Sequence, residues 1–216
     1  MKTVRNIKPH TIREVFLYLF TTIVLMSFGQ NTTTEVFSAK DILEVVVDGH
    51  QIFNIDIKAE VRNDIEVASV TSGEYQDYFQ INSKVDGNQL FINLEANPLK
   101  QINDDKRNAH KVISANLVLA LPEKLSLSIV SDVGSVNAQG KFKALKFNLA
   151  QGDCYIKGIV REAIIKTTSG NINAETNGAI IETDSQSGLV DFPSDMFGFN
   201  IWKLTTLSGN ITVNKL

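Results

Sequence analysis

The sequence predicts an all-β protein: a parallel β-solenoid of about five coils of ~18 residues, preceded by an antiparallel β meander that caps it. The first observation behind this prediction is a set of glycines that recur at intervals of 18, 18, 18 and 21 residues, namely Gly134, Gly152, Gly170, Gly188 and Gly209. The second is an alternation of apolar and polar residues on both sides of each glycine, which is typical of strands with one buried face. A β-sandwich with evenly spaced turns is the alternative architecture.

Residues 1–30 predict a secretory signal peptide. An uncharged, mostly apolar run of 14 residues, 15–28, ends beside the small residue Gly29 and follows a basic leader that contains Lys2, Arg5, Lys8 and Arg13. We expect cleavage after Gly29 or Gln30. The run is shorter than the ~20 residues that a membrane-spanning helix needs. An uncleaved anchor is the alternative, and only then is the chain expected to contact a membrane.

Residues 31–121 predict the antiparallel meander. The β-branched run 42–47, the turn signal Asp48-Gly49 and the alternating run 53–61 together indicate a β-hairpin. A second turn is expected at 86–88, and a later strand ends at Pro122. Because the first coil of a solenoid leaves backbone groups unpaired, we expect these strands to cover it.

Residues 122–216 predict the solenoid repeats, each made of a strand, a glycine turn and a second strand. The side chains two and four places after each glycine are expected to point inward: Val136/Ala138, Cys154/Ile156, Ile172/Ala174, Val190/Phe192 and Ile211/Val213. The side chains seven and five places before each glycine are expected to do the same: Leu127/Ile129, Leu145/Phe147, Ala163/Ile165, Ile181/Thr183 and Trp202/Leu204. The longer last interval indicates that residues 192–198 form a bulging loop, which suits Pro193.

The last predicted strand, 210–214, leaves no room in this sequence for a C-terminal cap. We therefore expect an unpaired strand edge at the C-terminal coil, with Ile211 and Val213 at the end of the apolar stack. Either the loop around Phe197 covers this edge, or the C-terminal coil forms a homo-oligomer or binds an envelope partner.

The charge balance argues against nucleic acid as a partner. Removal of residues 1–29 leaves 17 Lys and Arg against 23 Asp and Glu, a formal charge of −6. Proteins that bind nucleic acid or anionic membranes need a basic surface. A hydrophobic content of 43% and only four prolines indicate an ordered chain.

Cys154, the only cysteine, falls on an inward repeat position and is expected to be a buried apolar side chain. The polar loop 100–111 holds Asp104, Asp105 and His110, which are too few and too loosely spaced for zinc, so a solvated loop is expected. His10 and His50 have no visible partner. No metal-binding or cofactor-binding residue is predicted.

Catalytic patterns are not evident either. The carboxylates of Asp132, Asp153 and Asp184 occupy different repeat positions, so they predict no facing pair of the kind that cleaves a polysaccharide. The Ser-Gly pairs at 169–170, 187–188 and 208–209 fall at turns and are not expected to supply a nucleophile. No catalytic residue is predicted, and the protein is not expected to be an enzyme.

Several motifs in the mature chain resemble a known family. They are the strand 117–122 with its closing proline, the strand 125–129, and the repeated segments SGNIN (169–173) and SGNIT (208–212). In these motifs, and over residues 37–216, the chain resembles the putative-adhesin β-solenoid domains, which include auto-transporter adhesin head-like domains of exported bacterial proteins. The resemblance implies an all-β solenoid in the periplasm or on the outer surface of a Gram-negative bacterium. It supplies no catalytic residues.

Three function classes follow. The first is an exported, non-catalytic protein of the cell envelope or surface that serves as a binding or adhesion module, with a glycan or an unknown envelope protein as its partner. The second is an envelope-stress sensor or scaffold domain that binds another envelope protein. The third, which the residues favour least, is a polysaccharide-active β-helix enzyme.

Overall fold

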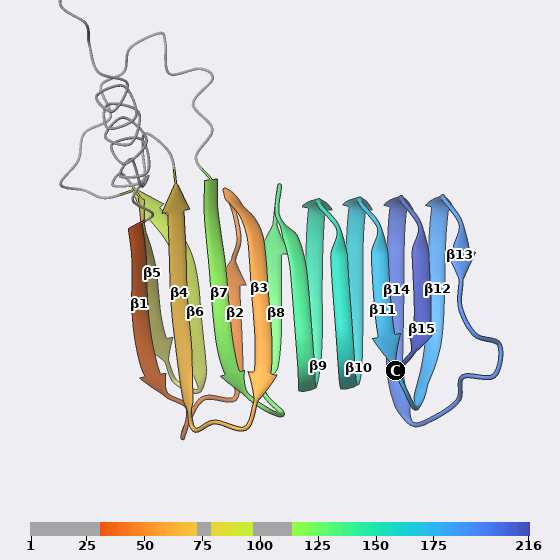
Figure 1. Ribbon diagram of the computed structural model, residues 1–216, viewed down its shortest axis with the longest axis horizontal. Helices are drawn as coiled ribbons and strands as arrows, with labels where there is room; N and C mark the ends of the chain where they lie inside the picture. The colour runs from red at the N-terminus through yellow and green to blue at the C-terminus, as the bar shows by residue number, and fades with distance from the viewer. Residues whose placement is uncertain (1–30, 73–78, 97–113) are drawn as a thin grey trace, which may run out of the picture. The chain divides into compact units, whose positions relative to one another are not determined.

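The computed structural model describes residues 31–72, 79–96 and 114–216 (Figure 1). The predicted leader, 1–30, and the polar loop 100–111 lie outside the described residues. Residues 31–216 form one compact unit. Within the described ranges every regular element is a β-strand, and all 15 strands belong to one mixed sheet. The prediction of an all-β fold is confirmed.

The strands lie along the chain as follows: β1 (Asn31–Ser38), β2 (Glu44–Asp48), β3 (Ile52–Glu60), β4 (Asp64–Ser72), β5 (Phe79–Asp86), β6 (Gln89–Ala96), β7 (Ser114–Pro122), β8 (Ser126–Ser131), β9 (Ser135–Gln151), β10 (Cys154–Ser169), β11 (Ile172–Thr176), β12 (Ala179–Ser187), β13 (Val190–Asp191), β14 (Asn200–Ser208) and β15 (Ile211–Lys215). The longest, β9 and β10, have 17 and 16 residues.

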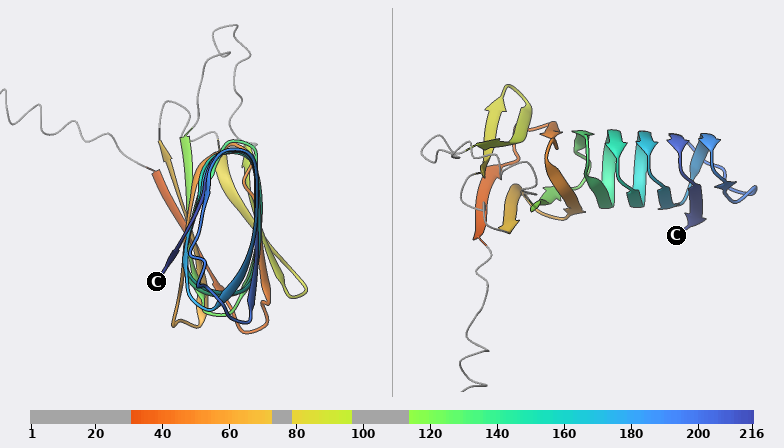
Figure 2. Two further views of the ribbon diagram at one scale, coloured as in Figure 1. Left: turned by 90° about the vertical axis from the view of Figure 1, so that its right-hand side faces the viewer. Right: turned by 90° about the horizontal axis from the view of Figure 1, so that it is seen from above.

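Strand pairing arranges these elements in two rows. Row A runs β1-β4-β7-β3-β9-β10-β11-β15-β13, and row B runs β5-β6-β2-β8-β9-β10-β14-β12. The first halves of β9 and β10 belong to row A and their second halves to row B, so each of these strands passes from one row to the other. Seen along the stack, the strands from β8 to β15 outline a flattened ring (Figure 2).

The predicted register is confirmed for the first three repeats and for the last one. In the fourth repeat the inward positions predicted for Val190 and Phe192 are wrong, because both side chains are exposed and β13 ends at Asp191. In row A, Cys154 pairs with Val136 on one side and Ile172 on the other, and Ile172 pairs in turn with Ile211. In row B, the residues that lie side by side are Leu127, Leu145, Ala163, Trp202 and Ile181, in that order. All these pairings are parallel. Residues that share a position in the glycine period therefore share a position across the strands.

The order of the repeats differs from the order of the chain. The last repeat, β14 and β15, lies between the third repeat and the fourth: β14 pairs with β10 and β12, and β15 pairs with β11 and β13. The expected loop is present between Asp191 and Asn200, and it carries the chain past this position. The C-terminal coil is therefore interior, and the expectation that Ile211 and Val213 end the stack is wrong, since both are buried.

The N-terminal strands depart further from the predicted meander. Among the described strands, antiparallel pairing is limited to β1–β4, β4–β7 and β5–β6. β2 pairs in parallel with β6 and β8, and β3 in parallel with β7 and β9. The predicted hairpin at Asp48-Gly49 is wrong, because β2 and β3 lie in different rows and do not pair. The turn at 86–88 does form a hairpin, in which Asp86 is opposite Gln89.

A column of stacked glycines explains the period. A Cβ atom on Gly152 would overlap the carbonyl oxygen of Gly134, and Gly152 has φ +112°, where L side chains are strained. The same overlap recurs up the column in the spatial order Gly134, Gly152, Gly170, Gly209 and Gly188. The turns approach each other too closely for any other residue.

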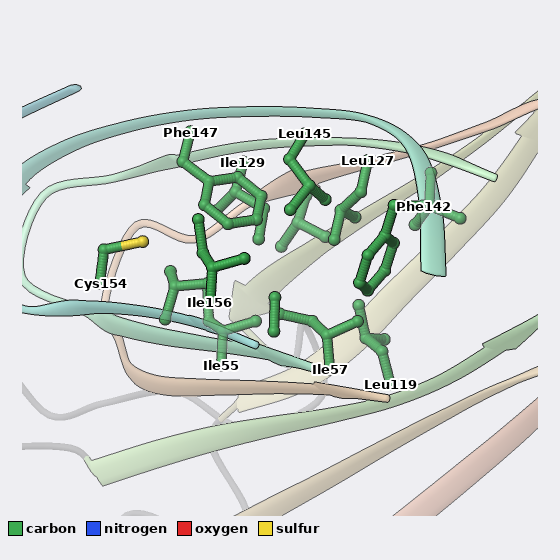
Figure 3. Packing of buried hydrophobic residues seen from close by; sticks show 14 of the residues in the cluster. Ile55, Ile57, Leu119, Leu127, Ile129, Phe142, Leu145, Phe147, Cys154 and Ile156 are labelled. Carbon is green, nitrogen blue, oxygen red and sulfur yellow. The ribbon is translucent and has the colours of Figure 1, made fainter. Parts of the chain in front are cut away.

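The core fills the space between the two rows. Figure 3 shows Leu127, Ile129, Leu145 and Phe147 from row B facing Ile55, Ile57, Cys154 and Ile156 from row A. Trp202 is fully buried and donates its indole N–H to the carbonyl oxygen of Val160 at 2.9 Å. Since Trp202 lies on β14 and Val160 on β10, this hydrogen bond links the last repeat to its neighbour in the stack. The described residues contain no helix long and apolar enough to cross a membrane.

Candidate functional site

The outer surface of row B has a shallow groove where β2, β8, β9 and β10 lie side by side. Its volume is about 350 Å³, and its lining consists of Glu44, Ser126, Leu127, Ser128, Ala144, Leu145, Lys146, Glu162 and Ile164. Ser126 and Ser128 on β8 and Ala144 in the second half of β9 are small outward side chains, whereas larger side chains stand on either side. We call this depression the β8 groove. It exists because the small side chains of Ser126 and Ala144 lie side by side between the longer ones of Glu44 and Glu162.

Glu44 is held in place at one wall of the β8 groove. Its Oε1 accepts a hydrogen bond from Ser128 Oγ at 2.7 Å, and its Oε2 accepts one from Gln89 Nε2 at 2.7 Å. The three residues come from β2, β8 and β6, and 84 residues of sequence separate Glu44 from Ser128. Glu162 on β10 and Lys146 on β9 also line the groove, which therefore offers carboxylate, ammonium and hydroxyl groups.

The outer surface of row A carries a different polar array. Tyr155 donates its hydroxyl to Glu175 Oε1 at 2.5 Å, and Lys157 Nζ lies 2.6 Å from Glu175 Oε2. The hydrogen bond from Lys157, followed by that from Tyr155, lowers the pKa of Glu175. The hydrogen bond to Glu175 raises the pKa of Tyr155. This array is flat and its charges are mutually satisfied, so it is a weaker candidate than the groove.

Side chains at the glycine turns bond to one another from repeat to repeat. Ser135 Oγ accepts from the Asp153 backbone N–H at 3.1 Å, and Asp153 Oδ1 accepts from that of Asn171 at 2.7 Å. Asn171 Oδ1 then accepts from the backbone N–H of Asn210 at 2.9 Å. Asn210 Oδ1 accepts in turn from the backbone N–H of Leu189, also at 2.9 Å. This ladder follows the spatial order of the repeats. It gives Asp153 a structural role in turns that would otherwise leave backbone donors unpaired.

Cys154 lies where the sequence placed it, fully buried on the inner surface of row A. Burial, with a smaller contribution from the charge of Asp153, raises the pKa of its thiol. A buried thiol of raised pKa is a poor nucleophile. Within the described ranges no three His, Cys, Asp or Glu side chains are grouped as a metal site.

The remaining residues considered from the sequence lie apart. Asp132 accepts a hydrogen bond from the Gln51 backbone N–H at 3.1 Å, and Asp184 is exposed on β12. His50, which seemed to lack a partner, forms a hydrogen bond through Nδ1 with Asp48 Oδ1. This bond, together with the charge of Asp48, raises the pKa of His50. The predicted loop ligands Asp104, Asp105 and His110 lie outside the described residues.

The sequence did not predict the β8 groove. Its walls come from strands that are far apart in the chain and adjacent in the sheet, and no local pattern shows which outward side chains are neighbours. The signal that was available is compositional: Ser126, Ser128 and Ala144 are small side chains at outward positions of two consecutive strands.

The end of the stack at β12 and β13 is the second notable surface. The exposed large apolar side chains between 180 and 201 are Ile180, Leu189, Val190, Phe192, Phe197, Phe199 and Ile201. Phe197 and Phe199 are 82% and 99% exposed. They lie in the loop between β13 and β14, at the far right of Figure 1. The fourth repeat, not the C-terminal coil, is the outermost one.

Comparison with known proteins supports the fold. No protein-family model matches the chain. No curated protein matches it either. Among solved structures it is similar to one described as a putative cell adhesion protein from Clostridium sporogenes, at 14% identity and a TM-score of 0.57, covering 87% of this chain and all of that one. A putative adhesin from Bacteroides fragilis also aligns, at 14% identity and a TM-score of 0.36, over 88% of this chain and 99% of that one.

The identity to the Clostridium sporogenes protein is too low to carry more than the fold. The TM-score of that pair, above 0.5, shows that the same arrangement of strands occurs in a second protein. The comparisons therefore show an all-β fold that a second protein shares, and nothing beyond the fold.

Proposed function

We propose that this chain is an exported, non-catalytic binding module of the bacterial cell envelope, folded as a β-solenoid of the putative-adhesin type. Its ligand is an extended, hydroxyl-rich chain, such as a stretch of polysaccharide, that lies in the β8 groove. The similarity of the fold to a protein described as a putative cell adhesion protein supports this function. So does the predicted signal peptide, residues 1–30, which directs the chain out of the cytoplasm.

The observation that carries the proposal is the chemistry of the β8 groove. Its volume of about 350 Å³ lies within the usual range of ligand sites. Ser126, Ser128, Glu44 and Lys146 line it with hydroxyl, carboxylate and ammonium groups. Such groups donate to and accept from sugar hydroxyls, and the hydrogen bonds from Ser128 and Gln89 fix the Glu44 carboxylate before any ligand arrives.

A glycan array tests the proposal, followed by calorimetric titration of any oligosaccharide that the protein retains. We compare wild type with Ala144→Arg, which fills the groove with a long side chain. Thr212→Arg is the matched control, because it adds the same side chain to an outward interior position of row A. We expect the groove variant to lose at least tenfold in affinity and the control to bind like wild type.

Two outcomes contradict the proposal. One is that the wild-type protein retains no glycan. The other is equal loss in Ala144→Arg and Thr212→Arg, because this places the ligand outside the groove. Melting temperatures of both variants establish that they are folded before binding is compared.

A further inference from the structure

The outermost strand, β12, offers a strand edge that no described part of the chain pairs with. One side of β12 pairs with β14 over eight residue positions from Ala179 to Ser187. β13, which ends the other row, has only two residues. Within the described residues, β12 is thus the long edge at this end of the stack. An edge of this length, with free N–H and C=O groups, is a template for one more strand.

The core also continues to this edge. Ile181 packs against the hydrophobic core and stays partly exposed, and Thr183, the next inward residue, is also half-buried. In the neighbouring last repeat, the same positions on β14 hold Trp202 and Leu204. Both are fully buried because repeats lie on either side of them. An added strand with apolar inward side chains would complete the burial of Ile181.

The outward side chains of β12 give the edge a charge. Glu182 and Asp184 are both exposed and lie two residues apart, so their side chains are on the same surface. Within the stack, the residue opposite Glu182 is Lys203. A next strand is therefore expected to place basic residues opposite Glu182 and Asp184, because opposite charges on facing positions stabilise neighbouring strands.

The same charges disfavour a second copy of this chain. An antiparallel β12–β12 pair centred on Thr183 places Glu182 opposite Asp184 of the other copy. Centring the pair on Glu182 places Glu182 opposite Glu182 of the other copy, and centring it on Asp184 places Asp184 opposite Asp184. Each register brings carboxylates face to face, which destabilises the pairing.

We propose that the outer edge of β12 accepts a β-strand from a partner protein. The accepted segment is extended, has apolar residues at alternate positions, and carries two basic residues two positions apart that face Glu182 and Asp184. The exposed Ile180, with Ile201 beside it, adds an apolar contact at the start of the segment. This site is independent of the β8 groove, which lies on other strands and takes a different ligand.

The test uses fluorescein-labelled nine-residue peptides and anisotropy titration against the mature chain. The probe peptide has Lys at its fourth and sixth positions and Val or Thr elsewhere. A second peptide has Glu in place of both lysines, and a third has Pro in place of the valine between them, which removes a ladder hydrogen bond. The protein variants are Glu182→Lys with Asp184→Lys, and the control Asp41→Lys with Asp86→Lys, which makes the same charge change at exposed positions elsewhere.

We expect wild type and the control to bind the Lys peptide at least tenfold more tightly than the Glu peptide, and the charge-reversed variant to show the opposite preference. The Pro peptide is expected to bind at least tenfold more weakly than the Lys peptide. Failure of charge reversal to exchange the preference overturns the proposal, as does equal binding of the Pro peptide. A wild-type dimer that the charge reversal abolishes in light scattering also overturns it, because the edge would then belong to a second copy.

Discussion

The two ends of the strand stack finish in different ways. At the N-terminal end the chain reverses direction, and β1, β4 and β5 add antiparallel strands to a parallel stack. Arg62 stabilises one reversal, between β3 and β4, through contacts with Asp64 at 2.8 Å and Glu66 at 3.1 Å. At the other end, β12 and β13 add no antiparallel strand and expose apolar side chains. Within the described residues, antiparallel strands therefore finish only the N-terminal end of the stack.

The largest expected effect separates the interior of the stack from its outermost repeat. Ile172→Asp places a carboxylate between the buried Cys154 and Ile211, with no partner, and is expected to cost roughly 5 kcal/mol in unfolding free energy. Ile181→Asp is expected to cost less than half of this, because water reaches the outer side of Ile181. Asn173→Asp, whose side chain points outward, is expected to stay within about 0.5 kcal/mol of wild type.

Urea denaturation of the three variants measures these costs. Equal destabilisation by Ile172→Asp and Asn173→Asp would contradict the strand register. Equal destabilisation by Ile172→Asp and Ile181→Asp would show instead that the fourth repeat is as well covered as the third.

Two phenylalanines sharpen the same comparison. Phe142 is buried at the start of the second half of β9, whereas Phe197 is 82% exposed at the open end. We expect Phe142→Ala to cost about 3–5 kcal/mol in unfolding free energy. Phe197→Ala is expected to change it by no more than about 0.5 kcal/mol. Thermal and chemical denaturation check both, and a cost above ~2 kcal/mol for Phe197→Ala would show that the loop is part of the core.

The glycines provide a third contrast, between the stacked turns and the N-terminal hairpin. Gly152→Ala forces a Cβ against the Gly134 carbonyl at an unfavourable φ, and we expect a loss of about 3 kcal/mol. Gly87 also has positive φ, at +57°, but a Cβ there meets nothing within 4 Å. Gly87→Ala is therefore expected to cost only about 1 kcal/mol. A larger loss at Gly87 than at Gly152, measured by urea denaturation, would be incompatible with the glycine column.

The smallest expected effect is a pH dependence at the turn between β2 and β3. The hydrogen bond to Asp48 raises the pKa of His50 above its unfolded value of about 6.5. Its stabilising contribution is thus complete below about pH 6.5 and is lost as the pH rises through the folded pKa. Because His50 is exposed, the shift in melting temperature should be slight. Between pH 6 and 9 the melting temperature of wild type is expected to fall slightly more than that of His50→Gln. An equal fall in both proteins would rule out this contribution.

The sequence predicts which residues share a position across the strands, but not which repeats are neighbours. Cys154, Ile172 and Ile211 share one position of the glycine period, and Cys154 pairs with Ile172 as expected. Ile172, however, pairs with Ile211 and not with Val190 of the next repeat in the chain. The period is the same whichever repeat lies next to which, so it carries no information on order. The longer last interval marked the loop that allows the last repeat to enter between two others.

The hairpin predicted at Asp48-Gly49 is wrong for a related reason. A tight turn joins two strands equally well whether they pair with each other or lie in opposite rows. β2 instead pairs across long stretches of sequence, with Glu44 opposite both Gln89 and Ser126. The β8 groove depends on these distant pairings, so it could not be predicted from the local pattern.

The central claim is that the last repeat lies between the third and the fourth. The most direct measurement is disulfide formation between introduced cysteines, made in a Cys154→Ala background. Asn173→Cys with Thr212→Cys joins adjacent positions of β11 and β15, within reach of a disulfide. Asn173→Cys with Asp191→Cys joins strands separated by β15, roughly 10 Å apart. The account predicts that under mild oxidation the first pair closes and the second stays reduced. Closure of the second pair and not the first would contradict it and restore stacking in chain order.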